Sequence, residues 1–63
     1  MIPIGSLLIS NEYMLRNNRK LSGVILEVKD DLWGKSYRVH LSNGTTHWMD
    51  EEKIRDLFIE VEQ

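Results

Sequence analysis

The sequence predicts an all-β fold: a small five-stranded barrel with a short helical turn before its last strand. First, the 63 residues suffice for one domain spanning 1–63, and no shift in composition marks a linker. Second, short apolar segments rich in β-branched residues alternate with clusters of Gly, Asn, Asp and Ser, the pattern of strands and turns. Third, a sheet of this size needs its edges covered or closed, which favours a barrel.

The first strand is expected at Leu7–Ile9, a short apolar run bounded by Gly5-Ser6 and by Ser10-Asn11. The polar segment 11–20 follows, with a few large apolar side chains embedded in it. It is either a helical turn or a long first loop, and Asn17-Asn18 favours a turn.

The second strand is expected over 22–28, which is rich in aliphatic residues. Gly23 near its start suggests a bulge or a sharp bend. We expect three of its side chains to point inward and to oppose three residues of the next strand: Val24 opposite Leu41, Leu26 opposite Val39, and Val28 opposite Tyr37. The outer face would then place Glu27 beside Arg38 and Ile25 beside His40.

The third strand, 35–41, alternates cleanly, with Tyr37, Val39 and Leu41 on one face. The turn Asn43-Gly44 predicts a two-residue type I′ loop, because both central positions of that turn need a positive φ. This register pairs Leu41 with Thr46, His40 with His47, Val39 with Trp48 and Arg38 with Met49. A three-residue loop would mix polar and apolar faces, so we expect Trp48 and Tyr37 in the core.

The C-terminal segment fits two structures. Asp50 can cap a helical turn at 51–54, and Leu57, Ile59 and Val61 alternate as a strand over about 56–61. We favour the turn followed by a closing strand. A terminal amphipathic helix over the sheet is the alternative.

Composition limits the function classes. The absence of cysteine excludes disulfides, thiolate metal sites and a cysteine nucleophile. No apolar stretch approaches the ~18 residues of a membrane span, and the N-terminus has no basic signal-peptide segment, so we expect no membrane association and a cytoplasmic location. The net charge of −2 argues against a general polyanion binder.

The segment 21–57 resembles the SH3-like barrel superfamily in its KOW, Tudor and Mind-bomb-like branches. The resemblance rests on Gly23 to Val28, on Tyr37-Arg38-Val39, on Asn43-Gly44, and on Trp48 followed by the acidic turn at 51–54. In size the chain also resembles small bacteriophage accessory proteins. The resemblance implies binding through loops and aromatic residues at one end of a barrel, with peptides, methylated side chains, RNA or partner proteins as ligands.

Two loops hold the candidate binding residues. The first loop contributes Tyr13, Arg16 and Arg19, and the segment 29–34 contributes Asp31 and Trp33, beside Asp30. We expect these loops to engage a partner protein, a host or virion protein if the chain is phage-encoded, because Trp is enriched at interface hot spots. The alternative for Trp33 is that its ring closes the core. A methyl-cation cage of Trp33, Tyr13 and Asp31 is a further reading.

Other functions are weaker expectations. Arg16, Arg19 and Lys20 would serve a weak RNA or single-stranded nucleic-acid binder of KOW type, and an exposed sheet edge would serve a homo-oligomer. His40 and His47, placed side by side, lack a third ligand, so we expect no metal. No nucleophile motif or phosphate loop occurs, and we expect a non-enzymatic module without cofactors.

Overall fold

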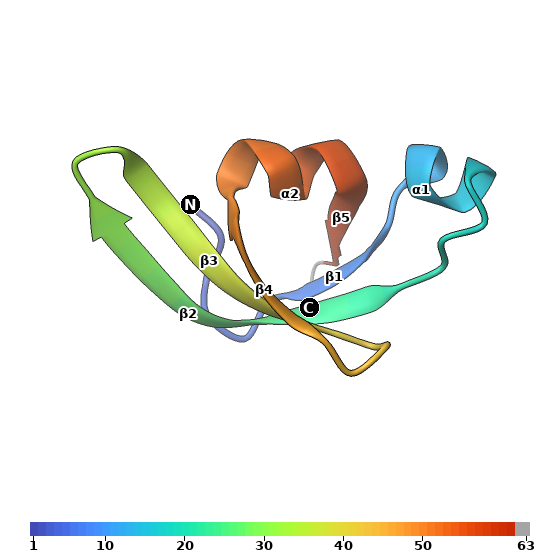
Figure 1. Ribbon diagram of the computed structural model, residues 1–63, viewed down its shortest axis with the longest axis horizontal. Coiled ribbons are helices and arrows are strands. Elements are labelled where there is room, and N and C mark those ends of the chain that lie inside the picture. The colour runs from blue at the N-terminus through green and yellow to red at the C-terminus, as the bar shows by residue number, and fades with distance from the viewer. Residues whose placement is uncertain (62–63) are drawn as a thin grey trace.

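Five antiparallel strands form one sheet in the computed structural model, which describes residues 1–61 (Figure 1). The elements are β1 (Leu7–Ser10), α1 (Glu12–Arg16), β2 (Ser22–Asp31), β3 (Gly34–Leu41), β4 (Thr46–Asp50), α2 (Glu51–Leu57) and β5 (Phe58–Val61). The strand order is β4-β3-β2-β1-β5. The expectation of a mostly β fold with five strands and a short helix before the last one is therefore confirmed.

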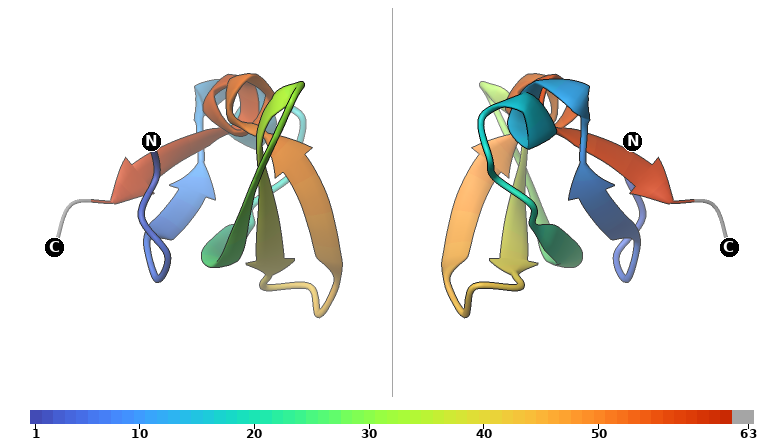
Figure 2. Two further views of the ribbon diagram at one scale, coloured as in Figure 1. Left: turned by 90° about the vertical axis from the view of Figure 1, so that its left-hand side faces the viewer. Right: turned by 90° about the vertical axis from the view of Figure 1, so that its right-hand side faces the viewer.

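The sheet is curved, and the helices lie on its concave side, as Figures 1 and 2 show. The core fills the space between α2 and the sheet. Its fully or nearly fully buried apolar side chains come from every strand, both helices and the N-terminal segment: Ile2, Leu8, Met14, Ile25, Tyr37, Val39, Leu41, Met49, Ile54 and Phe58. The prediction that Tyr37, Val39 and Leu41 point inward is confirmed.

β4 and β5 are the two ends of the sheet. Within residues 1–61 these two strands are not paired with each other, and α2 connects them along the chain. The five strands thus make one curved sheet, and closure into a barrel stays a prediction.

The hairpin between β3 and β4 differs from the predicted one. Val39 pairs with His47, and Arg38 pairs with Trp48, the register of the three-residue loop. Gly44 has a φ of 89° while Asn43 is absent from the residues with positive φ, so the type I′ conformation is not formed. Instead the Asn43 Oδ1 accepts a hydrogen bond from the Thr45 backbone N–H at 3.1 Å. Trp48 consequently lies outside and is 50% exposed; its predicted place in the core was wrong.

The predicted face of β2 was also wrong over its first half. Gly23 opposes Leu41 and Ile25 opposes Val39, so Ile25 is buried while Val24 faces outward. A bulge between Ile25 and Glu27 then shifts the register. Past this bulge the prediction holds: Val28 opposes Tyr37, and the Glu27 carboxylate accepts a hydrogen bond from Arg38 at 3.2 Å. An inserted residue flips every later side chain to the other face, which explains both results.

Both helices begin at side-chain caps. The Asn11 Oδ1 accepts from the Met14 N–H at 3.0 Å, so segment 11–20 opens with a helical turn. The Asp50 Oδ1 accepts from the Lys53 N–H at 2.7 Å. The predicted turn at 51–54 is confirmed but extends to Leu57, so β5 begins at Phe58 rather than near 56.

A polar contact joins Tyr37, in the middle of β3, to the first residue of α2. The Tyr37 hydroxyl donates to Glu51 Oε1 at 2.9 Å and accepts from the Ile2 N–H at 3.2 Å. The hydrogen bond from Tyr37, aided by the N-terminal amino group and Arg55, lowers the pKa of the Glu51 carboxyl. This contact holds the start of α2 over the core.

Candidate functional site

The tip of the β2–β3 hairpin exposes two large apolar side chains. Leu32 and Trp33 form the two-residue connection between Asp31 and Gly34, which are the last pair of the ladder. Leu32 is 98% exposed and Trp33 is 94% exposed. The alternative in which Trp33 closes the core is therefore wrong. Much of the predicted loop 29–34 is strand, so the tip projects from a hydrogen-bonded ladder, as Figure 1 shows.

Local polar contacts hold this tip. The Asp31 Oδ1 accepts from the Trp33 backbone N–H at 2.8 Å, and Gly34 has a φ of 113°, which favours glycine. One pair further back, the Lys35 ammonium contacts the Asp30 carboxylate at 2.7 Å. That hydrogen bond and charge raise the pKa of Lys35. Asp31 thus shapes the turn that presents Trp33, and any direct contact of Asp31 with a ligand stays a prediction.

The other predicted residues lie on and after α1. Tyr13 is 62% exposed and lines two shallow hollows, one with Lys53, Asp56 and Leu57 of α2 and one with Arg19. The Arg16 guanidinium pairs with Glu12 one helical turn away. These side chains are open to solvent.

The structure separates the two groups of predicted residues. The molecule measures 35 Å along its longest axis, and the hairpin tip and α1 lie at opposite ends of that axis in Figure 1. Tyr13 and Trp33 therefore do not share one surface, and a methyl-cation cage built from both is wrong. The two groups form separate candidate surfaces.

The histidines are not side by side. His40 opposes Thr46, whereas His47 opposes Val39 on the next pair, so the two imidazoles lie on opposite faces of the sheet. Each ring lies 3.0 Å from a threonine hydroxyl, Thr46 for His40 and Thr45 for His47. Residues 1–61 contain no group of three or more acidic or imidazole side chains placed to hold a metal ion.

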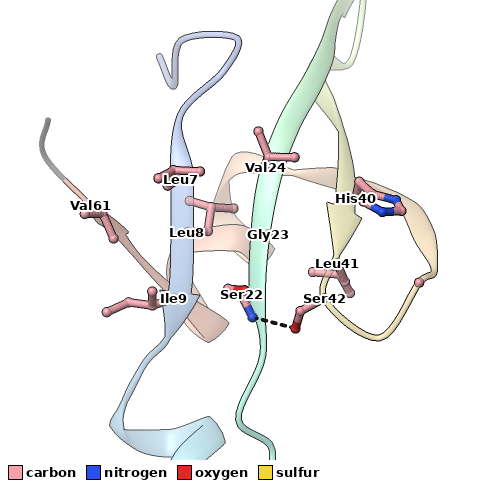
Figure 3. Close-up of a pocket in the computed structure, with 11 residues that line it drawn as sticks. Leu7, Leu8, Ile9, Ser22, Gly23, Val24, His40, Leu41, Ser42 and Val61 are labelled. Atoms are coloured by element: carbon pink, nitrogen blue, oxygen red, sulfur yellow. Dashed lines mark hydrogen bonds between the residues drawn. The ribbon is translucent and has the colours of Figure 1, made fainter.

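A groove on the outer side of the sheet was missed by the sequence reasoning. It has a volume of about 550 Å³ and runs over β2 between β1 and β3 (Figure 3). Leu7, Ile9 and Val61 line one side, and His40 and Ser42 line the other. We call the outward aliphatic side chains of β5, β1 and β2 the outer apolar face: Leu7, Ile9, Val24, Ile59 and Val61. A signal was present, because the unbroken run Leu7-Leu8-Ile9 does not alternate.

None of the helices in residues 1–61 has the length and apolar character needed to cross a membrane. Comparisons with protein-family models, with curated proteins and with solved structures found no match for this chain. What the surfaces do is therefore inferred from their chemistry.

Proposed function

We propose that the chain is a small non-enzymatic binding module that engages a partner protein by inserting the tip of its β2–β3 hairpin into an apolar pocket of that partner. The observation that carries this proposal is the exposure of Leu32 and Trp33, at 98% and 94%. Exposing two adjacent large apolar side chains at one projecting turn gains nothing for folding. Tryptophan is among the residues most enriched at protein-interface hot spots.

The turn also supports the proposal through its preorganisation. A side chain held before binding loses less conformational freedom when the complex forms. The backbone of Trp33 is held by the hydrogen bond to Asp31, and the ladder closes at the pair Asp31–Gly34. Asp30 is paired with Lys35 and Asp31 accepts from the Trp33 N–H, so apolar contact rather than charge is expected to supply most of the affinity at the tip.

Several expectations belong to the same proposal. Membership of the SH3-like superfamily, a cytoplasmic location and a host or virion partner for a phage-encoded chain remain predictions. The nucleic-acid alternative is less supported, because Arg16, Lys35 and Arg38 each contact a carboxylate. Such pairing reduces the positive potential that phosphate binding requires.

The test compares the two tryptophans. The Trp33→Ala variant is expected to keep the thermal unfolding midpoint and to lose partner capture, by at least about 30-fold in affinity for a hot-spot residue. Trp48→Ala is the matched control, because Trp48 is half-exposed on β4, away from the tip. Capture is measured by affinity pull-down of tagged protein from lysate, followed by mass spectrometry and by titration of the purified partner.

Two results would reject the proposal. Equal capture by wild type and Trp33→Ala would show that the tip is not the contact. Capture that disappears after nuclease treatment would move the function to nucleic-acid binding, with Arg16, Arg19 and Lys20 as the residues to replace next.

A further inference from the structure

The outer apolar face is the largest feature that the proposed tip contact leaves unused. On β1, Leu7 is 43% exposed and Ile9 is 46% exposed, although the residue between them, Leu8, is buried in the core. Ile59 on the neighbouring β5 is 53% exposed. An antiparallel sheet with one face in water normally carries polar side chains there, so this part of the outer side has the composition of a covered surface.

The strand register arranges these side chains in rows. Leu7 lies between Val24 on β2 and Val61 on β5, and Ile9 lies between Ser22 and Ile59. The side chains of β1 and β5 therefore form an aliphatic ridge made of Leu7, Ile9, Ile59 and Val61. The directly adjoining stretch of β2, Ser22-Gly23-Val24, carries small side chains and forms the floor of the 550 Å³ groove, as Figure 3 shows.

A ridge and a parallel groove side by side on one face are self-complementary. A two-fold axis that lies in the plane of the interface, between the ridge and the groove and parallel to both, lays the ridge of each copy into the groove of the other. This is the isologous contact of a symmetric dimer, in which the same surface patch serves both partners. Helix α2 lies on the other side of the sheet (Figure 1), and α1 reaches the outer side only through Leu15 at the end of the groove, so neither helix covers the middle of the face.

The charges on this face are compatible with such a contact. A patch that meets its own copy brings each charge close to a like charge, which is unfavourable. The outward positions of the ridge and the groove floor carry no Asp, Glu, Lys or Arg, and His40 and Ser42 form the far wall. A second copy can therefore dock without placing equal charges against each other at the centre of the interface.

The dimensions of the outer side leave room for the contact that a modest dimer needs. Stable interfaces start at about 600 Å² per partner, roughly one-eighth of the 4671 Å² surface of the chain. The groove continues through Ile9, Ser22 and Ser42 into a second hollow of about 380 Å³ lined by Leu15 and Lys20. The outer side extends along the 35 Å and 19 Å axes of the molecule, which accommodates a contact of this size.

We propose that the outer apolar face is a homodimer interface, in which the ridge of Leu7, Ile9, Ile59 and Val61 packs into the groove over β2 of a second copy. The dimer presents two β2–β3 tips, one from each copy. The interface does not involve Leu32 or Trp33, so dimer formation and partner capture are separate properties.

Sedimentation equilibrium of the full chain tests this proposal between about 1 μM and 1 mM, a range that brackets dissociation constants of the expected micromolar order. Wild type is expected to change from monomer to dimer over that range. Leu7→Lys is expected to weaken association by about 100-fold or more, because each dimer would bury two unpaired ammonium groups. Leu32→Lys makes the same replacement at the hairpin tip and is expected to leave the dimer unchanged.

Folding of each variant is checked by circular dichroism. If Leu7→Lys does not fold, Ile9→Lys takes its place with the same expectation, since Ile9 is equally exposed. A mixture of isotope-labelled and unlabelled protein adds a direct measurement: intermolecular NOEs from the methyl groups of Leu7 and Ile9 to Val24. Wild type that stays monomeric at about 1 mM, a dimer lost in Leu32→Lys but kept in Leu7→Lys, or a dimer without these NOEs would each overturn the proposal.

Discussion

β3 and β1 contribute to the same core but differ on the outer side of the sheet. β3 buries Tyr37 and Val39 and places Arg38 and His40 outward. β1 buries Leu8 and places Leu7 and Ile9 outward. Alternation on β3 is explained by one core and one solvated face. The unbroken apolar run on β1 needs a second reason, and the proposed homodimer interface supplies one.

The largest expected effect separates the two sides of β1. Leu8→Ala removes a side chain that is 1% exposed and should cost about 2–5 kcal/mol, which is comparable with the whole stability of a domain of this size. Leu7→Ala should cost less than about 1 kcal/mol in the monomer. Urea denaturation at a concentration that keeps the chain monomeric measures both. Equal losses would mean that Leu7 belongs to the core and that β1 has no distinct outer face.

A smaller effect is expected on the outer side of β3. Arg38 and Glu27 form an ion pair at 3.2 Å in which the side chains are 42% and 56% exposed. Exposed pairs of this kind contribute about 0.2–1 kcal/mol, and salt weakens them. A double-mutant cycle of Arg38→Ala and Glu27→Ala should give a coupling energy within that range. A coupling well above it would indicate that the outer side of β3 is also shielded from water.

The smallest expected effect concerns the hydrogen bond between Tyr37 of β3 and Glu51 of α2, and it is measured as the change of stability in acid. Because the hydrogen bond from Tyr37 lowers the pKa of Glu51 below its ordinary 4.5, the folded state binds this proton less readily than the unfolded state. The stabilisation is complete above pH 4.5 and is lost as the pH falls through the lowered pKa. The thermal unfolding midpoint of wild type should therefore fall more steeply with decreasing pH than that of Glu51→Gln.

Glu52→Gln provides the control for this titration, because it removes the same charge from the adjacent position of α2. Its unfolding midpoint should follow wild type as the pH falls. If Glu52→Gln flattened the acid dependence as much as Glu51→Gln, general charge repulsion rather than the Tyr37 contact would be the cause.

The strands were predictable from sequence because each has the composition and length of a strand between turn residues. The register of the β3–β4 hairpin was not, because Asn43-Gly44 fits a two-residue and a three-residue loop. The side-chain hydrogen bond of Asn43 to the Thr45 N–H accompanies the second of these. The position of the bulge at Ile25/Glu27 was not predictable either, because Gly23, which suggested a bulge, pairs regularly with Leu41. Both errors moved apolar residues, Trp48 and Val24, to the wrong face.

The candidate site was predictable in part. Trp33 was recognised as a binding candidate because it stands among polar residues, but its exposure depends on a ladder that continues to the pair Asp31–Gly34. The separation of Tyr13 from Trp33 depends on the whole sheet and has no local sequence signal. The outer apolar face did have such a signal in Leu7-Leu8-Ile9, a run that predicts the first strand but also does not alternate.

The two-residue turn at the tip of the hairpin bears on how such a protein can change over evolutionary time. Leu32 and Trp33 are almost wholly exposed, and the backbone that presents them is held by Asp31 and Gly34. Substitutions at positions 32 and 33 therefore alter the presented chemistry with little effect on folding. Selection can act on recognition at this turn while the rest of the chain serves as an unchanged scaffold.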